Sequence, residues 1–397
     1  MTIKKFNSEH DQQQFLNLNS YAFNYTRTPD HDKRALDMIP HCDLWGAFDD
    51  ETLTSQIMVL PYSVKIGAQD VQMAGIGNVA TYPEYRGNGG IRALFGEIFK
   101  ELEEKEIPLS YLAPFSQPFY RKFGYETVFE TVSGTLTRDT VTQLPFTTEG
   151  TIKRVDKNDP KWREVLKTLY SETLGKDFGA VGREDWWWEA KLSYRKIHEV
   201  AVVFDSAQEP VGYLMYQMEG SKFIIKELAY KTKQALYKLN GFISSHSGTF
   251  ETFHYSASLL EKMTLLFPEC RVLEQKIEQD MMVKIVLFDK FMTSYPFNPN
   301  TNLSVSLSIE DNSSQYNDGT WQLTIENGAA SCKKLSDDHL ENADFSGTIQ
   351  KWTQVFMGHS KLNSHIFLEY ITGRSEEKIE ELENSIPNVT PCLYDYF

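Results

Sequence analysis

Apolar and polar positions along the first eighty residues predict two helices followed by strands. Apolar residues recur at helical spacing between residues 8 and 25 and again over Asp30–Ile39, where Pro40 ends the second helix. The residues that follow favour strands, because they are rich in apolar and β-branched side chains and are bounded by turn residues. These predicted strands are Leu44–Asp49, Gln56–Ile66 and Val71–Tyr82.

The third predicted strand contains Gly75 and Gly77, and it leads into a turn that is rich in glycine. A glycine inside a strand often marks a bulge or the close approach of another group. The turn, Arg86-Gly87-Asn88-Gly89-Gly90, opens a predicted helix from Ile91 to about Lys105. Free backbone N–H groups converge at such a helix N-terminus, and the helix dipole favours negative charge there. We therefore expect this turn to bind a phosphorylated cofactor, with glycines at three positions because a pyrophosphate lies close to the backbone.

Beyond the helix, the pattern predicts a strand over Leu109–Ala113, a short helical turn near Gln117–Lys122 and strands through Thr127–Leu136. Helices come first in this region, then an antiparallel meander, then a strand–helix–strand unit. This order predicts a mixed α/β domain that ends near residue 145.

From Thr151 the pattern partly repeats. The predicted helices are Pro160–Leu174, Trp186–Leu192 and Gln234–Ser244, and the predicted strands are Val200–Phe204, Pro210–Gln217 and Phe223–Tyr230. The segment at the place of the glycine turn, Ala229–Gln234, contains no glycine. A diphosphate cannot approach such a backbone closely. We interpret this half as a duplicated domain that has lost its ligand, and a second active site is the alternative.

Past residue 284 the pattern predicts a third domain, of α+β class, joined through Tyr295–Pro299. Alternating strands are predicted over Val305–Ile309, Gly319–Glu326 and Ala330–Lys333, with Asp-Gly and Asn-Gly turn signals. Helices are predicted over Ile349–Phe356 and Ser375–Asn384.

Length and composition fit a multidomain protein in a reducing cytoplasm. A chain of 397 residues with 41% hydrophobic and 24% charged residues favours two or three globular domains. No apolar run approaches the ~20 residues that cross a bilayer, and the N-terminus lacks the apolar core of a signal peptide. The four cysteines form no Cys-x-x-Cys pair, and the histidines show no metal-ligand spacing, so we expect no metal site.

The formal net charge of −15 excludes nucleic acid as the expected partner, because nucleic acid requires a basic surface. A negative surface suits a cationic small substrate, since it concentrates cations near a cleft. Solubility alone is the alternative explanation of this charge.

Three side chains near the glycine turn are candidates for chemistry. Arg86 and Arg92 flank the turn, where they either bind phosphate in bidentate fashion or are ordinary solvated surface groups. Tyr120 lies between Phe119 and Phe123. Such a tyrosine is either a core residue or a proton donor to a leaving thiolate, since the reference pKa values of a phenol and a thiol differ by only ~1.5 units.

The last residues, Val389–Phe397, are strongly aromatic, whereas chain ends are usually polar and frayed. We expect this segment to pack against the protein and to carry the α-carboxylate of Phe397 with it. A buried carboxylate has a raised pKa and can serve as a general base, which is one role among several.

Two motifs together resemble the GCN5-related N-acetyltransferases (GNAT). They are the turn Arg86–Gly90, which opens a helix, and the segment Phe119-Tyr120-Arg121-Lys122-Phe123-Gly124-Tyr125 about thirty residues later. The order of domains, the length and the terminal Phe397 resemble the enhanced intracellular survival (Eis) family. The resemblance covers the whole chain and implies an α/β (α+β) multidomain fold. It comprises tandem GNAT acetyltransferase folds over 1–147 and 148–288, the second degenerate, followed by a sterol-carrier-protein-like α+β domain over 289–397.

The resemblance also implies roles for individual residues. Tyr120 matches the general acid and the Phe397 carboxylate the general base of the family. The residues that would hold acetyl-CoA, the co-substrate, are Val79, Ala80 and Thr81 for the pantetheine arm, and Arg86, Gly87, Asn88, Gly89, Gly90, Ile91 and Arg92 for the pyrophosphate. The region Phe23–Arg34 and Asn78 fall where family members contact the acceptor. Family members acetylate aminoglycoside amines and assemble as hexamers, which implies a homo-oligomer.

The leading hypothesis is therefore acetyl transfer from acetyl-CoA to a primary amine of an aminoglycoside or another cationic small molecule, without a metal. A second hypothesis keeps the fold and makes protein lysines the target. A third is a non-catalytic acyl-CoA sensor or lipid carrier that uses the third domain.

Overall fold

A computed structural model describes residues 1–194, 197, 199–258, 263–269, 271, 273–335 and 343–397. The chain forms two compact units. The first contains residues 1–129, 280–391 and 396–397, and the second contains residues 130–279 and 392–395. In the part of the chain that is described, no helix is long and apolar enough to cross a bilayer.

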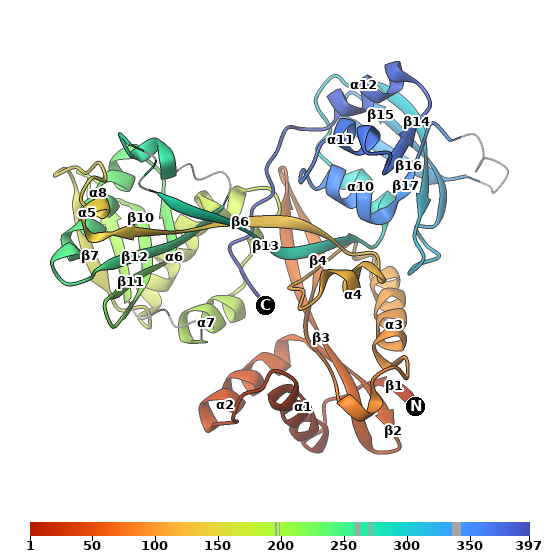
Figure 1. Ribbon diagram of the computed structural model, residues 1–397, viewed down its shortest axis with the longest axis horizontal. Coiled ribbons are helices and arrows are strands. Elements are labelled where there is room, and N and C mark those ends of the chain that lie inside the picture. The colour runs from red at the N-terminus through yellow and green to blue at the C-terminus, as the bar shows by residue number, and fades with distance from the viewer. Residues whose placement is uncertain (195–196, 198, 259–262, 270, 272, 336–342) are drawn as a thin grey trace. The chain divides into compact units, whose positions relative to one another are not determined.

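The amino-terminal part of the first unit is a twisted sheet with helices on both faces (Figure 1). Its strand order is β1-β2-β3-β4-β5-β13, in which β4 and β5 run parallel and the other neighbours are antiparallel. The strands are β1 (Thr2–Lys5), β2 (Asp43–Asp49), β3 (Thr52–Ile66), β4 (Gln69–Thr81), β5 (Leu109–Leu112) and β13 (Glu274–Ile285), followed in sequence after β5 by β6 (Glu126–Thr137).

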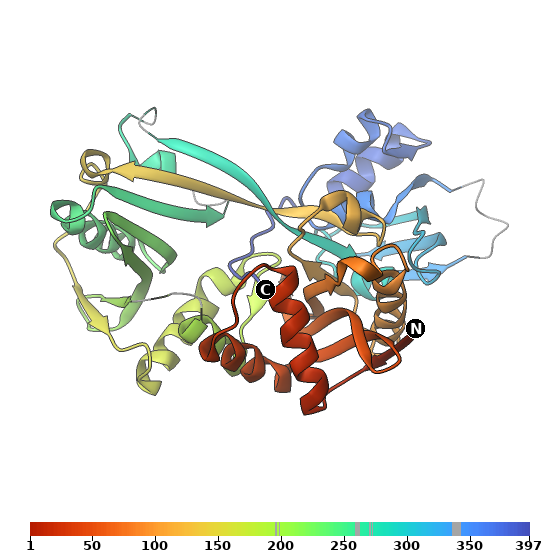
Figure 2. The ribbon, with the colours of Figure 1, turned by 60° about the horizontal axis from the view of Figure 1, so that its bottom comes forward.

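Helices cover the two faces of this sheet. On one face lies α3 (Gly90–Glu104), whose buried Leu94, Phe95 and Ile98 pack with Ile57 and Ile76 of the sheet. The other face contacts α1 (Glu9–Ala22), which packs on β3 and β4 and is drawn in front of the sheet in Figure 2. The remaining helices of this part are α2 (Pro29–Met38), with the 3-10 turn η1 (Ile39–His41), η2 (Pro83–Tyr85) and α4 (Gln117–Arg121).

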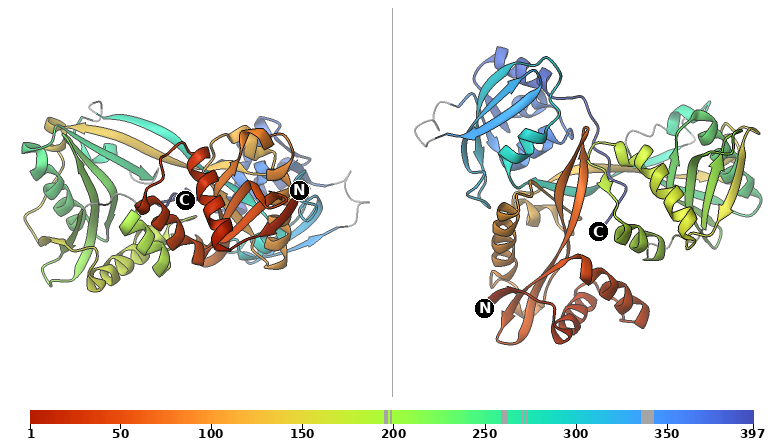
Figure 3. Two further views of the ribbon diagram at one scale, coloured as in Figure 1. Left: turned by 90° about the horizontal axis from the view of Figure 1, so that it is seen from below. Right: turned by 180° about the vertical axis from the view of Figure 1, so that it is seen from behind.

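The carboxy-terminal part of the first unit is a five-stranded sheet of order β16-β15-β14-β17-β18 with helices packed on it (Figure 3). Its strands are β14 (Leu303–Glu310), β15 (Gly319–Glu326), β16 (Ala329–Lys334), β17 (Phe345–Thr348) and β18 (Ile371–Gly373). Its helices are α9 (Phe288–Ser294), α10 (Ile349–Phe356), α11 (Leu362–Phe367) and α12 (Glu376–Ser385). Trp352 and Phe356 of α10 stack with their centroids 5.7 Å apart in the core of this part.

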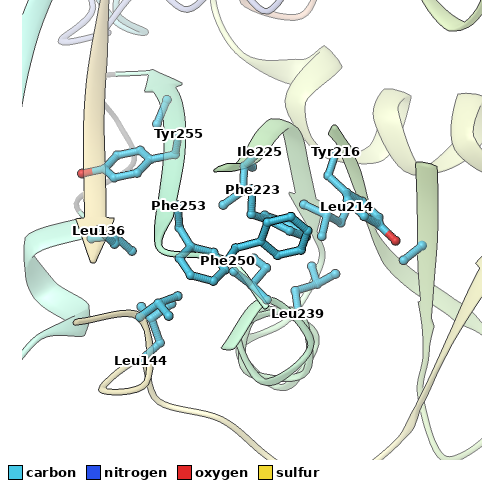
Figure 4. Packing of buried hydrophobic residues seen from close by; sticks show 14 of the residues in the cluster. Leu136, Leu144, Leu214, Tyr216, Phe223, Ile225, Leu239, Phe250, Phe253 and Tyr255 are labelled. Atoms are coloured by element: carbon cyan, nitrogen blue, oxygen red, sulfur yellow. The ribbon is translucent and has the colours of Figure 1, made fainter. Parts of the chain in front are cut away.

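The second unit repeats the arrangement of the first. Its strand order is β6-β12-β11-β10-β9-β7, with β11 and β12 parallel. The elements are α5 (Arg138–Val141), β7 (Thr151–Val155), α6 (Pro160–Glu172), η3 (Leu174–Lys176), β8 (Val181–Gly182), α7 (Asp185–Tyr194), β9 (Glu199–Phe204), β10 (Pro210–Glu219), β11 (Lys222–Tyr230), α8 (Lys233–Ser245), η4 (His246–Gly248), β12 (Thr252–Ser258) and η5 (Met263–Leu266). Figure 4 shows the core under α8, where Leu239 packs with Phe223 and Phe253.

The structure confirms the predicted helices and strands of the three regions to within a few residues. It also adds elements that the pattern did not indicate. The expectation that helices come first is wrong, because β1 precedes α1 and pairs with β2. The long strand β13 was missed as well, because its first half, Glu274–Gln279, is polar and carries no apolar alternation.

Candidate active site

A β-bulge lies near the end of β4. Gln56 pairs with Ala80 and Met58 with Gly77, so two residues of β4, Asn78 and Val79, stand opposite a single residue of β3. Asn78 adopts a φ of +50°, and its side-chain amide lies 3.4 Å from the sulfur of Met58. Such a bulge changes the direction in which backbone groups point. The glycine-containing strand therefore carries the irregularity that its sequence predicted.

Strands β4 and β5 separate just before this bulge. Their parallel pairing extends from Met73–Leu109 to Ile76–Leu112, where β5 ends. Strand β4 continues to Thr81. In the described chain, no strand pairs with the β5-facing edge of β4 beyond Ile76. Backbone N–H and C=O groups at an unpaired edge can bond a ligand in extended conformation. The predicted pantetheine residues Val79, Ala80 and Thr81 lie in this segment.

The glycine turn forms an open helix N-terminus. Gly87 and Gly89 have φ values of +86° and +80°, which favour glycine, and no described atom lies within 4 Å of where a Cβ would stand on either. Gly89 is the N-cap of α3, and no side chain among the described residues caps this helix. The first amides of α3 are thus available to an anion.

A side chain is excluded at Gly90 for a different reason. A Cβ on Gly90 would lie 2.6 Å from the hydroxyl oxygen of Ser55 on β3, so glycine permits α3 to pack directly on the sheet. The Ser55 hydroxyl in turn accepts a hydrogen bond of 2.9 Å from Thr81. The expectation that ligand proximity explains all three glycines is therefore wrong at Gly90, where packing inside the protein explains the residue.

The side chains that flank the turn are exposed. Arg86 is the first residue of the turn and Arg92 lies in the first turn of α3; between them Asn88 is exposed and Ile91 is partly buried. Both guanidinium groups are therefore free of the desolvation that burial would impose, and both stand beside the open helix N-terminus. The structure brings the predicted pyrophosphate residues, Arg86 to Arg92, into one continuous segment.

Tyr120 lies in an aromatic cluster on the α3 face of the sheet. It is 2% exposed and sits on the short helix α4. Its ring makes edge contacts with Phe95, Phe115 and Phe119 at centroid distances of 6.4, 5.4 and 5.2 Å. Burial raises the pKa of the Tyr120 hydroxyl well above its ordinary value, and nearby Tyr396 raises it further. The hydroxyl therefore keeps its proton throughout the neutral pH range.

The carboxy-terminal part of the first unit holds the helix of Tyr120 in place. The side-chain amide of Gln350 donates a 2.9 Å hydrogen bond to the backbone oxygen of Arg121. Arg121 itself donates two hydrogen bonds of 2.9 and 2.7 Å to the buried carboxylate of Glu126. Gly124 has a φ of +84°, and a Cβ there would lie 2.4 Å from the Lys284 ammonium nitrogen. The glycine of the aromatic motif is thus required by both conformation and space.

The C-terminal residue lies against β3 and β4. The Phe397 ring stands 4.8 Å from the ring of Tyr62, centroid to centroid. A Cβ added to Gly75 would lie 2.8 Å from an atom of the Phe397 ring, and one added to Gly77 would lie 3.8 Å from the carboxyl carbon. Gly75 therefore leaves the room that the Phe397 ring fills, as its place in a strand indicated, whereas a Cβ on Gly77 would make only an ordinary van der Waals contact. The C-terminus is marked beside these strands in Figure 1.

The structure thus gathers the predicted site residues in the first unit. Strand β4 carries the bulge and contacts Phe397, and the residue before Phe397, Tyr396, acts electrostatically on Tyr120. Sequence reasoning missed Tyr62, whose ring lies against the Phe397 ring in a tilted arrangement, and Tyr111, which pairs with Gly75. The Tyr111 hydroxyl is buried and has no hydrogen-bond partner among the described residues. A tyrosine in an apolar strand carries no local signal of such a place.

The corresponding helix of the second unit has a closed N-terminus. Only Lys231 and Thr232 connect β11 to α8, and the Thr232 side chain accepts a 3.1 Å hydrogen bond from the Ala235 amide. A capped N-terminus offers one fewer free donor to an anion. This agrees with a copy that does not bind a diphosphate.

Comparison with known families places these features in a known class of enzymes. The family model of an acetyltransferase (GNAT) domain matches residues 2–128, and a second acetyltransferase (GNAT) domain model matches residues 179–285. A sterol carrier protein domain model matches residues 288–394. A search of curated proteins found no match.

Solved structures resemble the chain over its full length. A conserved protein of unknown function from Enterococcus faecalis, described as a probable N-acyltransferase, is 35% identical with a TM-score of 0.93, covering 100% of this chain and 99% of that one. A GCN5-related N-acetyltransferase from Anabaena variabilis is 20% identical with a TM-score of 0.88, and Eis1 from Mycobacterium abscessus is 14% identical with a TM-score of 0.82. Each of these two matches covers 100% of this chain and 100% of the other chain, and each shows that the fold is shared.

This chain belongs to the GCN5-related N-acetyltransferases. It consists of two GNAT domains followed by a sterol-carrier-protein-like domain, which confirms the predicted fold class. The chain is an acyltransferase, and GNAT domains use acetyl-CoA.

Proposed function

We propose that this enzyme transfers the acetyl group of acetyl-CoA to a primary amine of a cationic small molecule, such as an aminoglycoside. Phe397 is the observation that carries this proposal. Its carboxyl group lies beside Gly77, next to the bulge of β4 and within the unit that contains the open helix N-terminus. A carboxylate attracts an ammonium group, and the net charge of −15 favours cations in general.

In this proposal, the turn Arg86–Arg92 holds the pyrophosphate through the first amides of α3 and the two guanidinium groups. The unpaired edge of β4 over Val79–Thr81 binds the pantetheine arm. Bound acetyl-CoA supplies the thioester that reacts.

The chain's own groups then move two protons. The Phe397 carboxylate accepts a proton from the substrate ammonium, directly or through one water, and so frees the amine lone pair for attack on the thioester carbonyl. A backbone N–H of Val79–Thr81 donates to the carbonyl oxygen as negative charge develops on it. As the carbon–sulfur bond breaks, the Tyr120 hydroxyl donates its proton to the sulfur. The attacking nitrogen loses its second proton to solvent as the carbon–sulfur bond breaks, and the products are an amide and CoA. Of the two protons that the nitrogen has lost, one returns Tyr120 to its starting state through solvent and the other is released, which leaves the Phe397 carboxylate ionised again.

The wider identity of the protein is part of the same proposal. We assign it to the Eis family, with domains over 1–147, 148–288 and 289–397, as a cytoplasmic homo-oligomer. The full-length similarity to Eis1 in fold supports the order of domains. We favour a structural role for the third domain over lipid transport, because aromatic rings fill its core: Phe288 and Tyr295 both pack against Phe356.

A thiol-release assay with acetyl-CoA tests the reaction against polyamines, aminoglycosides and lysine peptides. The proposal predicts turnover with small polyamines or aminoglycosides, whereas turnover restricted to lysine peptides would show a protein acetyltransferase. Tyr120→Phe and a chain that lacks Phe397 should each lower kcat by about 100-fold or more, the scale of general acid–base catalysis. Normal turnover by soluble variants that bind CoA would remove both assignments.

A further inference from the structure

The segment just before Phe397 is buried in the second unit. The side chain of Asp395 is 0% exposed, and its oxygens accept hydrogen bonds of 2.9 Å from the Arg183 Nε and of 2.9 Å from the Trp187 indole. Lys191 lies 3.3 Å from the same carboxylate. The Lys191 ammonium also donates to the backbone oxygen of Tyr394 at 2.9 Å. Both the side chain and the backbone of this tail segment are therefore held.

Arg183 joins the tail to the sheet of the second copy. Its side chain is 0% exposed and donates two further hydrogen bonds, of 2.9 and 2.6 Å, to Glu227 on β11. The hydroxyl of Tyr213 on β10 donates to the same carboxylate at 2.6 Å. The ring of Tyr170 lies 3.7 Å from the guanidinium carbon. One guanidinium thus binds Glu227 in bidentate fashion through its two terminal nitrogens and Asp395 through Nε. The planar fork of arginine permits this arrangement and the ammonium group of lysine does not.

This cluster of two positive and two negative side chains lies on the face of the second copy's sheet that is opposite α8. Strand β11 corresponds to β4. Each is the second strand of an antiparallel pair, β10–β11 or β3–β4, and each is followed in the sequence by a helix, α8 or α3. Tyr213 packs with Tyr170 and Trp188 from α6 and α7, on the face opposite α8. In the first copy the face opposite α3 is the one that receives Phe397 beside Tyr62 and Gly75. The face that receives Phe397 in the first copy is thus filled in the second by charged groups that bind the tail.

We propose that the second acetyltransferase copy anchors the C-terminal tail, with Arg183 and Asp395 as positioning residues for the Phe397 carboxylate. This inference rests on the proposed role of Phe397 as general base. Consecutive Cα atoms are ~3.8 Å apart, so two residues of chain confine the Cα of Phe397 to within ~7.6 Å of that of Asp395. Without an anchor a chain end frays, and a misplaced base slows the reaction even where the fold is intact.

Kinetics of Asp395→Asn test the inference. This change keeps the shape of the side chain and removes its charge, and Arg183 retains Glu227 as its partner. We expect kcat to fall about 10-fold while the KM for acetyl-CoA stays unchanged, because the cofactor turn is untouched. Asp395→Ala should lower kcat further. The kcat of Arg183→Lys should lie between that of the wild type and that of Arg183→Gln. A wild-type kcat for both Asp395 variants overturns the proposal.

A double-variant cycle separates positioning from a general loss of stability. If Asp395 acts through Phe397, then Asp395→Asn has no further effect on kcat in a chain that lacks Phe397. Equal losses in both backgrounds overturn the inference and leave the proposed base intact. Normal turnover by the chain without Phe397 instead overturns the base assignment itself, so the two failures are distinguishable.

Leu239→Ala is the matched control, because Leu239 is fully buried in the core of the same unit under α8 and does not touch the tail (Figure 4). It should lower the melting temperature and leave kcat within twofold of wild type.

Digestion with carboxypeptidase measures directly how firmly the C-terminus is held. Release of Phe397 should be at least about fivefold faster from Asp395→Asn than from Leu239→Ala, and equal rates would contradict the anchor.

Discussion

The two acetyltransferase copies differ most clearly where the helix after the fourth strand begins. In the first copy the N-cap Gly89 has a left-handed conformation and leaves the amides of α3 uncapped by any described side chain. In the second copy Thr232 caps α8, and the connection contains two residues. Both sequences form the same strand and helix. The few residues between them decide whether the helix N-terminus is open, and we propose that this determines which copy binds a diphosphate.

The opposite faces of the two sheets differ as well. In the first copy Gly75 leaves space against β4, which the Phe397 ring fills. In the second copy the corresponding strand β11 carries Glu227, which is paired with the buried Arg183. A buried charge is costly unless it is paired, so this face is committed to its internal partners. The two copies thus share a fold while different side chains fill the corresponding faces of their sheets.

The largest effect is expected from placing a negative charge at the open helix N-terminus. Gly89→Asp should weaken acetyl-CoA binding by about 100-fold or more, because two like charges ~4 Å apart repel by several kcal/mol near a protein surface. Isothermal titration calorimetry measures the change. Gly89→Asn is the matched control, since asparagine tolerates the same left-handed conformation and carries no charge. Equal affinities for the two variants would show that this turn does not bind the pyrophosphate.

The next effect concerns the space beside β4. Gly75→Ala adds a Cβ that would lie 2.8 Å from the Phe397 ring and 2.7 Å from the Tyr62 ring. The tail must shift, and a displaced base costs on the order of 10- to 100-fold in kcat with an unchanged Kd for acetyl-CoA. Gly96→Ala, on α3 where no described atom lies within 4 Å of the new Cβ, should keep full activity and gain up to ~1 kcal/mol of stability. Full activity of Gly75→Ala would place the working carboxylate elsewhere.

A pH effect is expected in the second copy. Burial alone would raise the pKa of Glu227, but the charges of Arg183 and Lys191 lower it from 4.5 to about 2. The carboxylate therefore stabilises the fold above pH 4.5, and this contribution is lost as the pH falls toward 2. Circular dichroism melts between pH 5 and pH 2 should show a falling melting temperature. Glu227→Gln should be less stable at pH 5 and less sensitive to pH; a profile as steep as that of wild type would assign the acid sensitivity to other groups.

The smallest effect is expected at the capped helix. Thr232→Ala removes the hydroxyl that accepts from the Ala235 amide, at a cost of about 1 kcal/mol in the free energy of unfolding. Thr232→Ser keeps the cap and should behave as wild type in thermal denaturation. Both variants should retain full acetyl-CoA affinity if the second copy has lost its ligand, as we propose. Weaker binding by Thr232→Ala would point to a second cofactor site.

Much of this architecture could be predicted from local patterns. The strand, the glycine turn and the helix after it depend on conformational preferences within about twenty residues, as the left-handed conformations of Gly87 and Gly89 show. Gly75 and Gly77 signalled a bulge or a close approach; Gly75 is approached by Phe397 and Gly77 lies beside the bulge, but the sequence did not indicate the approaching residue. Gly90 was misinterpreted because its neighbour, Ser55, is thirty-five positions away in the sequence.

Local sequence preferences established the repeated strand–helix units and the open turn, because backbone geometry there follows from neighbouring residues alone. Tertiary structure decided the burial of Tyr120, the contact between Phe397 and Gly75, and the pairing of Arg183 with Asp395. The last two pairs are separated by more than two hundred residues. Such contacts depend on how whole sheets and helices pack, and no pattern within a short window of sequence carries that information.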